Sequence, residues 1–260
     1  MLVAMINKIV DYLRLVKFSH TIFAMPMALL AFTYAWVTTS PEQPLWVLLV
    51  QVVLCMVFAR NVAMGFNRWA DRKIDAENPR TAMREIPAGR VSPRGAVVFV
   101  VVNAVLFIAV AASINALCGW LSPVALAIVM FYSYCKRFTA MAHIVLGISL
   151  GIAPVGATMA VMGAAPLECW LLALVVMSWC AGFDIIYALQ DAEFDRERGL
   201  HSIPSHFSAR TSLHISALLH MASIALLLWY ASFQPQSWLL YVGCAMFASI
   251  VASEHYIVTP

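Results

Sequence analysis

The chain has 260 residues, of which 63% are hydrophobic and only 11% are charged. A water-soluble domain carries about 25% charged residues, so this composition excludes that class and indicates a membrane protein. The net charge of +3 is small, and we expect no nucleic-acid partner.

Eight apolar stretches follow one another along the chain, and each is close to the length of about 20 helical residues that crosses a bilayer. Backbone groups in lipid must be paired within a segment, and the alternating pattern of barrel strands is not seen, so we expect helices. The amphipathic start of the chain shows no signal-peptide cleavage site. The sequence predicts a single all-α polytopic domain over residues 1–260, with spans at residues 20–38, 45–66, 94–114, 117–134, 141–162, 168–190, 211–231 and 236–252.

Apart from Arg60, Lys and Arg are restricted to the N-terminus and to alternate loops. Seven of them lie between Arg68 and Arg94, whereas the loops near Pro41, Asn115, Gly163 and Pro235 contain none. By the positive-inside rule, the N-terminus and the basic loops lie on the cytoplasmic side. We therefore expect an integral protein of a bacterial inner membrane.

Two charged motifs close the second and the sixth predicted spans. The first, NRWADRKIDAENPR, places Asn67, Asp71 and Asp75 four residues apart, and the second, DIIYALQDAEFDRERGLHSIP, does the same for Asp191 and Asp195. The second pair lies 120 residues after the first, and an Ile-Pro dipeptide follows each motif. This echo predicts two pseudo-repeated four-helix halves, which commonly place a site at their interface.

Carboxylates at positions i and i+4 share one face of a helix and repel each other. Either neighbouring basic residues or a bound divalent cation must compensate them. A stripe of oxygen ligands suits Mg²⁺, which commonly binds through one or two carboxylates together with substrate phosphates. Basic side chains would then neutralise the phosphate groups: Arg72, Lys73, Arg84, Lys136 and Arg137.

The simpler alternative is that both motifs are wet surface loops in which acids and bases pair. The match between them argues against it, and so do two ionisable residues placed inside predicted spans, Asp184 and Arg60, which could also pair with each other. His20, near the start of the first span, is better explained as an interfacial polar residue than as a contact to a substrate.

The two motifs resemble those of the UbiA-type intramembrane prenyltransferase superfamily and look closest to its 4-hydroxybenzoate polyprenyltransferase branch. The opening KFSHTIFAMPMALLAF looks more like a subgroup that includes the prenyltransferase of the futalosine route to menaquinone. The resemblance implies a helical bundle around a central cavity, in which Mg²⁺ bridges a prenyl diphosphate to the Asp clusters. The family normally has nine spans, so we expect either a ninth helix beyond the given residues or a member that lacks it.

The resemblance also implies an activity: transfer of a polyprenyl group from polyprenyl diphosphate to a ring carbon of an aromatic acid. The acceptor would be 4-hydroxybenzoate or a dihydroxynaphthoate, in ubiquinone or menaquinone biosynthesis. The resemblance assigns metal binding to Asn67, Asp71, Asp75, Asp191 and Asp195, and catalysis to the four Asp residues. It assigns contacts with the diphosphate or the acceptor to the five basic residues above. Asp184, Tyr187 and Gln190 would line the acceptor side.

A secondary transporter with two helical halves is the alternative function. Transporters place their site near the bilayer midplane, whereas these carboxylates cluster at helix ends beside Arg and Lys, which favours phosphate chemistry at one membrane face. Neither the choice of acceptor nor the prenyl length nor the oligomeric state follows from the sequence.

Overall fold

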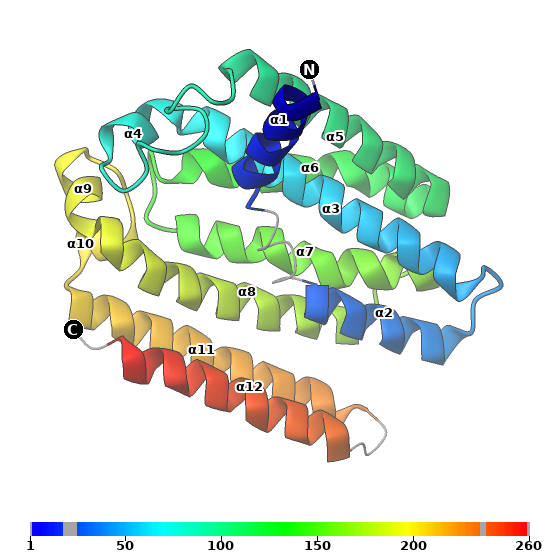
Figure 1. Cartoon of the computed structure of the whole chain (residues 1–260). Helices are drawn as coiled ribbons and strands as arrows, with labels where there is room; N and C mark the ends of the chain where they lie inside the picture. Colours follow the sequence, from blue (N-terminus) through cyan, green and yellow to red (C-terminus); the bar gives the residue numbers. More distant parts are fainter. Residues whose placement is uncertain (1, 18–24, 235–237, 259–260) are drawn as a thin grey trace. The chain divides into compact units, whose positions relative to one another are not determined.

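A computed structural model of the chain describes residues 2–17, 25–234 and 238–258 (Figure 1). All regular secondary structure in these ranges is helical, which confirms the all-α class. In the same ranges, seven helices are long and apolar enough to cross a membrane: α3 (Leu45–Ala70), α5 (Pro93–Ile114), α6 (Ala116–Cys135), α7 (Ala142–Met162), α8 (Leu167–Ala188) with its continuation, α11 (Ala209–Ser232) and α12 (Trp238–Ile257).

The first predicted span is not among these seven helices. Its described part is α2 (Met25–Thr39), which has 15 residues and follows α1 (Leu2–Leu15) in the chain. The expected beginning of the span, including His20, lies outside the described residues. Seven of the eight predicted spans are therefore found as helices of membrane-spanning length within the described ranges, and the first span stays a prediction.

The chain divides into two compact units. The first comprises residues 1–26, 35–134 and 159–163, and the second comprises residues 27–34, 135–158 and 164–260. Helices α3, α5 and α6 belong to the first unit, and α8, α11 and α12 belong to the second. The division agrees broadly with the two predicted halves, while the single domain stays a prediction.

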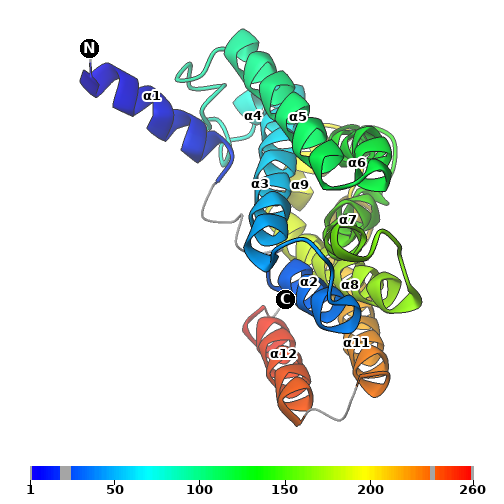
Figure 2. The same ribbon diagram turned by 90° about the vertical axis from the view of Figure 1, so that its right-hand side faces the viewer.

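In the first unit, α3 and α5 run side by side (Figures 1 and 2). Their contact is apolar around Val62 and Val100, with Leu126 of α6 in the same cluster. One polar contact crosses it, because Asn61 Nδ2 donates a hydrogen bond of 2.8 Å to Asn103 Oδ1. Such interhelical amide bonds help to hold membrane helices together.

In the second unit, α8 is the central helix. In its most apolar stretch 67% of the residues are buried, compared with 11% in α12, and α11 packs along it (Figure 1). Small and polar residues make this contact close. Ser216 Oγ donates to the Gly182 carbonyl at 2.7 Å, and Ser223 Oγ donates to the Val175 carbonyl at 2.9 Å. Small residues and hydroxyl bonds are the usual means of close packing between membrane helices.

Replacement of Gly182 by alanine tests this packing. The new methyl group would overlap the ring of His220, which is held by the Trp179 carbonyl at 3.1 Å and by His255 at 2.8 Å. Overpacking of this kind costs about 1–3 kcal/mol. We expect Gly182→Ala to lower the midpoint of thermal unfolding in detergent.

The matched control is Gly243→Ala in α12, where nothing lies within 4 Å of the added methyl group. This variant should keep or slightly raise the midpoint, because alanine favours a helix over glycine. Equal midpoints for the two variants would contradict the close approach of α8 and α11.

Candidate functional site

Both motifs lie where a long helix is interrupted. Helix α3 ends at Ala70, and α4 (Arg72–Glu77) begins after Asp71. Helix α8 passes through a 3₁₀ turn, η2 (Leu189–Asp191), into α9 (Ala192–Glu197). Asp71 has φ −91° and ψ 4°, and Asp191 has φ −111° and ψ 5°. The repeat seen in the sequence therefore extends to the backbone conformation of its first aspartate.

The predicted spacing of four residues is kept across this break in the first motif. The Asp71 amide still donates to the Asn67 carbonyl at 2.9 Å, and the Asp75 amide donates to the Asp71 carbonyl at 2.8 Å. Asn67 Nδ2 donates to Asp71 Oδ2 at 3.1 Å. Asn67 and Asp71 are thus neighbours, as their spacing predicts.

A chain of turns after α4 brings Arg84 back to the first motif. Thr81 Oγ1 donates to the Asp75 carbonyl at 3.0 Å, and Asn78 Oδ1 accepts from the Arg80 amide at 2.9 Å. These bonds fix the loop so that Arg84 Nη1 lies 2.7 Å from Asp75 Oδ1. Arg84, predicted as a phosphate ligand, is the ion-pair partner of Asp75.

The second motif is closed by a helix-terminating turn. Gly199, with φ +64°, follows the end of α9. The Leu200 amide then donates to the Asp195 carbonyl at 2.8 Å, and the Gly199 amide donates to the Arg196 carbonyl at 3.3 Å. This is the hydrogen-bond pattern of a Schellman motif, in which glycine adopts the left-handed conformation at no steric cost. The turn directly follows Asp195 in the chain and is bonded to its carbonyl.

All four aspartates are buried, with exposed fractions from 2% at Asp195 to 9% at Asp71. The second aspartate of each motif has the same feature. Asp75 Oδ2 and Asp195 Oδ2 are both inaccessible and have no hydrogen-bond partner among the described residues. Burial of an unpaired carboxylate oxygen costs free energy, so a cation at each motif would satisfy these atoms.

The donor chemistry fits a hard divalent cation. Within the described ranges, no three His, Cys, Asp or Glu side chains converge into a protein-only metal cage. Mg²⁺ does not need one, because it keeps several waters and is commonly held by one or two carboxylates together with phosphate oxygens. The residues present therefore fit Mg²⁺ better than Zn²⁺, which takes three or four protein ligands.

The predicted basic residues are distributed over both units. Arg72 stacks on the ring of Trp69, with its Cζ 4.9 Å from the ring centroid, and donates to the Trp69 carbonyl at 2.6 Å. Lys73 and Arg137 are exposed. The Lys136 carbonyl accepts a bond of 2.7 Å from the His201 amide, so the loop after the second motif is bonded to the loop after α6.

Of the residues expected on the acceptor side, Tyr187 lies in the last turn of α8, and Gln190 is exposed in η2. Asp184 lies deeper in α8, where its Oδ2 is 2.7 Å from Nδ1 of His143 at the start of α7. No role was predicted for His143 from the sequence. The signal that could have identified it was the need of an aspartate within an apolar span for a partner.

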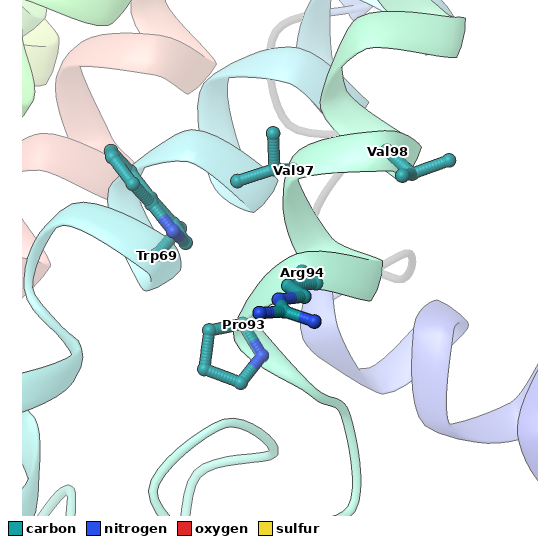
Figure 3. A pocket seen from close by; sticks show the side chains of 5 residues that line it. All are labelled: Trp69, Pro93, Arg94, Val97 and Val98. Atoms are coloured by element: carbon teal, nitrogen blue, oxygen red, sulfur yellow. The ribbon is translucent and has the colours of Figure 1, made fainter.

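A hollow of about 510 Å³ lies beside the first motif. Figure 3 shows Trp69 from the end of α3 opposite Pro93 and Arg94 at the start of α5, with Val97 and Val98 on the next turn. Its lining contains no carboxylate, so it does not supply metal ligands.

Three comparisons with known proteins found proteins similar to this chain. Residues 24–260 match the model of the UbiA prenyltransferase family. A 4-hydroxybenzoate octaprenyltransferase of Serratia proteamaculans is 34% identical over 77% of this chain and 70% of its own length. A UbiA homologue from Aeropyrum pernix is 32% identical and superposes with a TM-score of 0.85, covering 92% of this chain and 88% of that one.

A second solved structure has a lower sequence identity. A UbiA homologue from Archaeoglobus fulgidus, bound to GPP and Mg²⁺, is 22% identical and superposes with a TM-score of 0.76 over 95% of this chain and 87% of that one. At this identity the likeness concerns the fold.

Arg84→Met tests the ion pair at the first motif. Loss of the guanidinium leaves Asp75 as a buried carboxylate without its charged partner, which costs about 3 kcal/mol in such pairs. We expect a lower midpoint of thermal unfolding, and we expect added Mg²⁺ to raise the midpoint more in this variant than in the wild type.

Arg90→Met is the control in the same loop. Its pair with Glu85 is 3.5 Å long and its side chain is 38% exposed, so it contributes less than about 1 kcal/mol. A response to Mg²⁺ that is equal in Arg84→Met and Arg90→Met would contradict a cation site at Asp75.

Proposed function

The chain belongs to the UbiA prenyltransferase family, and on that basis we propose that it transfers a polyprenyl group from polyprenyl diphosphate to a ring carbon of an aromatic acid. Family membership makes it a prenyltransferase, so the transporter alternative is not retained. The relatives are named 4-hydroxybenzoate octaprenyltransferases, which makes 4-hydroxybenzoate the first acceptor to test. A dihydroxynaphthoate is the second.

The observation that carries the proposal is the pair of buried, unpartnered oxygens, Asp75 Oδ2 and Asp195 Oδ2. They occupy equivalent positions in two motifs, and a bound cation would compensate the negative charge of each. A diphosphate is the substrate group that needs cations most, since it has to leave with its negative charge stabilised. The homologue bound to GPP and Mg²⁺ supports the same pairing of ligands.

In this proposal, the metal ligands are the oxygens of Asn67, Asp71, Asp75, Asp191 and Asp195. When bound, Mg²⁺ supplies Lewis acidity that favours departure of the diphosphate. Lys73, Lys136 and Arg137 neutralise the remaining phosphate charge or the acceptor carboxylate, and Arg72 presents its guanidinium from the face of Trp69. Arg84 acts on the first motif through Asp75.

The reaction exchanges one bond for another. The C–O bond between the allylic carbon and the diphosphate breaks, and its electron pair leaves on the diphosphate. A ring carbon beside the phenolic hydroxyl bonds to the allylic carbon, and the ring then passes a proton to the released diphosphate and becomes aromatic again. The chain holds both substrates, and its apolar helices exclude water from the allylic carbocation that the broken C–O bond leaves.

The membrane location follows from the substrate. A polyprenyl tail is insoluble in water, and the seven helices of membrane-spanning length in the described residues support an enzyme that works where such a tail resides. We assign both motifs to the cytoplasmic face of a bacterial inner membrane, because the Lys- and Arg-rich loops carry them.

Prenyl transfer by the purified protein in lipid tests the proposal, with Mg²⁺, radiolabelled polyprenyl diphosphate and each acceptor offered separately. We expect product with one acceptor and none in EDTA. Asp75→Asn and Asp195→Asn each remove a ligand charge, so kcat/KM should fall about 100-fold or more.

Glu193→Gln is the matched control, since Glu193 is exposed on α9 two residues before Asp195. It should leave the rate unchanged. Folded wild type that gives no product with either acceptor would refute the proposed aromatic acids, and wild-type rates in both Asp variants would refute the cation site.

A further inference from the structure

His143 is a buried histidine to which the proposed chemistry assigns no role. It lies near the start of α7 with 1% of its surface exposed. Its two ring nitrogens have different partners: Nδ1 is 2.7 Å from Asp184 Oδ2, and Nε2 is 3.2 Å from the backbone nitrogen of Ile203. Ile203 is the first residue of α10 (Ile203–His206).

These partners determine where the ring proton is. A backbone N–H can only donate, so Nε2 of His143 accepts and carries no hydrogen. Nδ1 must then carry the hydrogen of the neutral ring and donate it to the Asp184 carboxylate. Both nitrogens are used, which leaves His143 to act as a bridge and not as a metal ligand or a base.

The bridge joins the two ends of the segment that carries the second motif. Asp184 precedes Asp191 and Asp195 in the chain, and Ile203 follows them. The far end is stiffened by a capping box, in which the Ser205 amide donates to Ser202 Oγ and the Ser202 amide donates to Ser205 Oγ. His143 thereby closes residues 184–203 into a loop.

A second bond ties the same segment to a predicted phosphate ligand. The His201 amide donates to the carbonyl of Lys136, which precedes His143 in the α6–α7 connection. The connection therefore holds the second motif at two points, through His201 and through Ile203. Loss of the His143 contacts would remove one of these two points.

We propose that His143 is a positioning residue for the second motif, and that it sets the affinity of the enzyme for the divalent cation and the diphosphate. This role rests on the proposed function. It differs from ordinary packing, because an apolar side chain could fill the volume but could not fix both Asp184 and the Ile203 amide.

Two substitutions test the bond to Asp184 and the bond to the Ile203 amide separately. In His143→Gln, the amide oxygen reaches the former place of Nε2 and can accept from the Ile203 amide. In His143→Asn, the amide nitrogen occupies the former place of Nδ1 and can donate to Asp184, but the bond to Ile203 is lost. His214→Gln is the control, because His214 is an exposed histidine on α11 of the same unit.

The first readout needs no turnover. We expect hydrogen exchange of the 200–206 peptide to be faster in His143→Asn than in His143→Gln and in wild type. The Mg²⁺ concentration that gives half of the maximal thermal stabilisation should rise about tenfold in His143→Asn, which corresponds to the loss of one hydrogen bond to a fixed backbone group.

The second readout is kinetic. In His143→Asn, the KM for polyprenyl diphosphate should rise about tenfold while the KM for the aromatic acceptor stays near that of wild type. His143→Gln should recover most of this loss. A purely structural role would lower the unfolding midpoint of both variants and leave Mg²⁺ dependence and KM per folded molecule unchanged, which would overturn the proposal.

The outcomes also separate this proposal from the proposed reaction. If wild type makes no prenylated product but His143→Asn still loses Mg²⁺ affinity and amide protection, the aromatic acceptor is wrong and the bridge stands. If wild type is active and both variants match it in Mg²⁺ affinity, exchange and KM, the bridge is wrong and the reaction stands.

Discussion

A carboxylate that is buried at the end of an apolar helix needs positive charge nearby, and this requirement shapes both motifs. Removal of one ionised group from water costs several kcal/mol even after the protein relaxes. At Asp75 the cost is offset in part by Arg84, at 2.7 Å, but one oxygen is left over. Asp195 has a leftover oxygen at the equivalent place. The fold maintains these two costly atoms at the same point of two helices, which a stability requirement alone would not favour.

The two motifs share the spacing and the burial of their aspartates, but the contacts that support them differ. In the first, Thr81 and Arg84 come from the loop that directly follows α4, so the motif is held by its own continuation. In the second, the Schellman turn is local, but His143 belongs to another helix, and it is bonded to Asp184. The internal repeat therefore extends to the aspartates and the backbone break, while the surrounding contacts differ. Substitutions that look equivalent in the repeat need not have equivalent effects.

Hydropathy predicted most of the fold, because the length of an apolar run determines whether a helix can cross a bilayer. Helix α5 (Pro93–Ile114) and helix α7 (Ala142–Met162) begin and end within one residue of the predicted spans. The interruption at Asp71 was not predicted, since the i, i+4 spacing is the same in a continuous helix and in one that is broken at a single residue.

The partner of Asp184 shows more clearly what could not be predicted from the sequence. Its burial within a span predicted a partner, and Arg60 was the charged residue that the sequence offered. The partner at 2.7 Å is His143, which lies 41 residues earlier in the chain. Spacing along the chain carries no information about a contact between two helices, so this pair was accessible only from the tertiary structure. The ion pair of Arg84 with Asp75 was not predicted either, because a basic residue in a loop looks the same in sequence whether or not it contacts a buried aspartate.

The number of carboxylates in each unit also limits how cations can bind. Each of the two motifs supplies two aspartates, and within the described ranges no unit gathers a third acidic, histidine or cysteine ligand at either pair. Two carboxylates hold Mg²⁺ weakly until phosphate oxygens complete its coordination. In the proposed reaction on a diphosphate, cation binding and substrate binding would therefore depend on each other. The aspartates would hold the cation firmly only while the diphosphate supplies the remaining oxygen ligands.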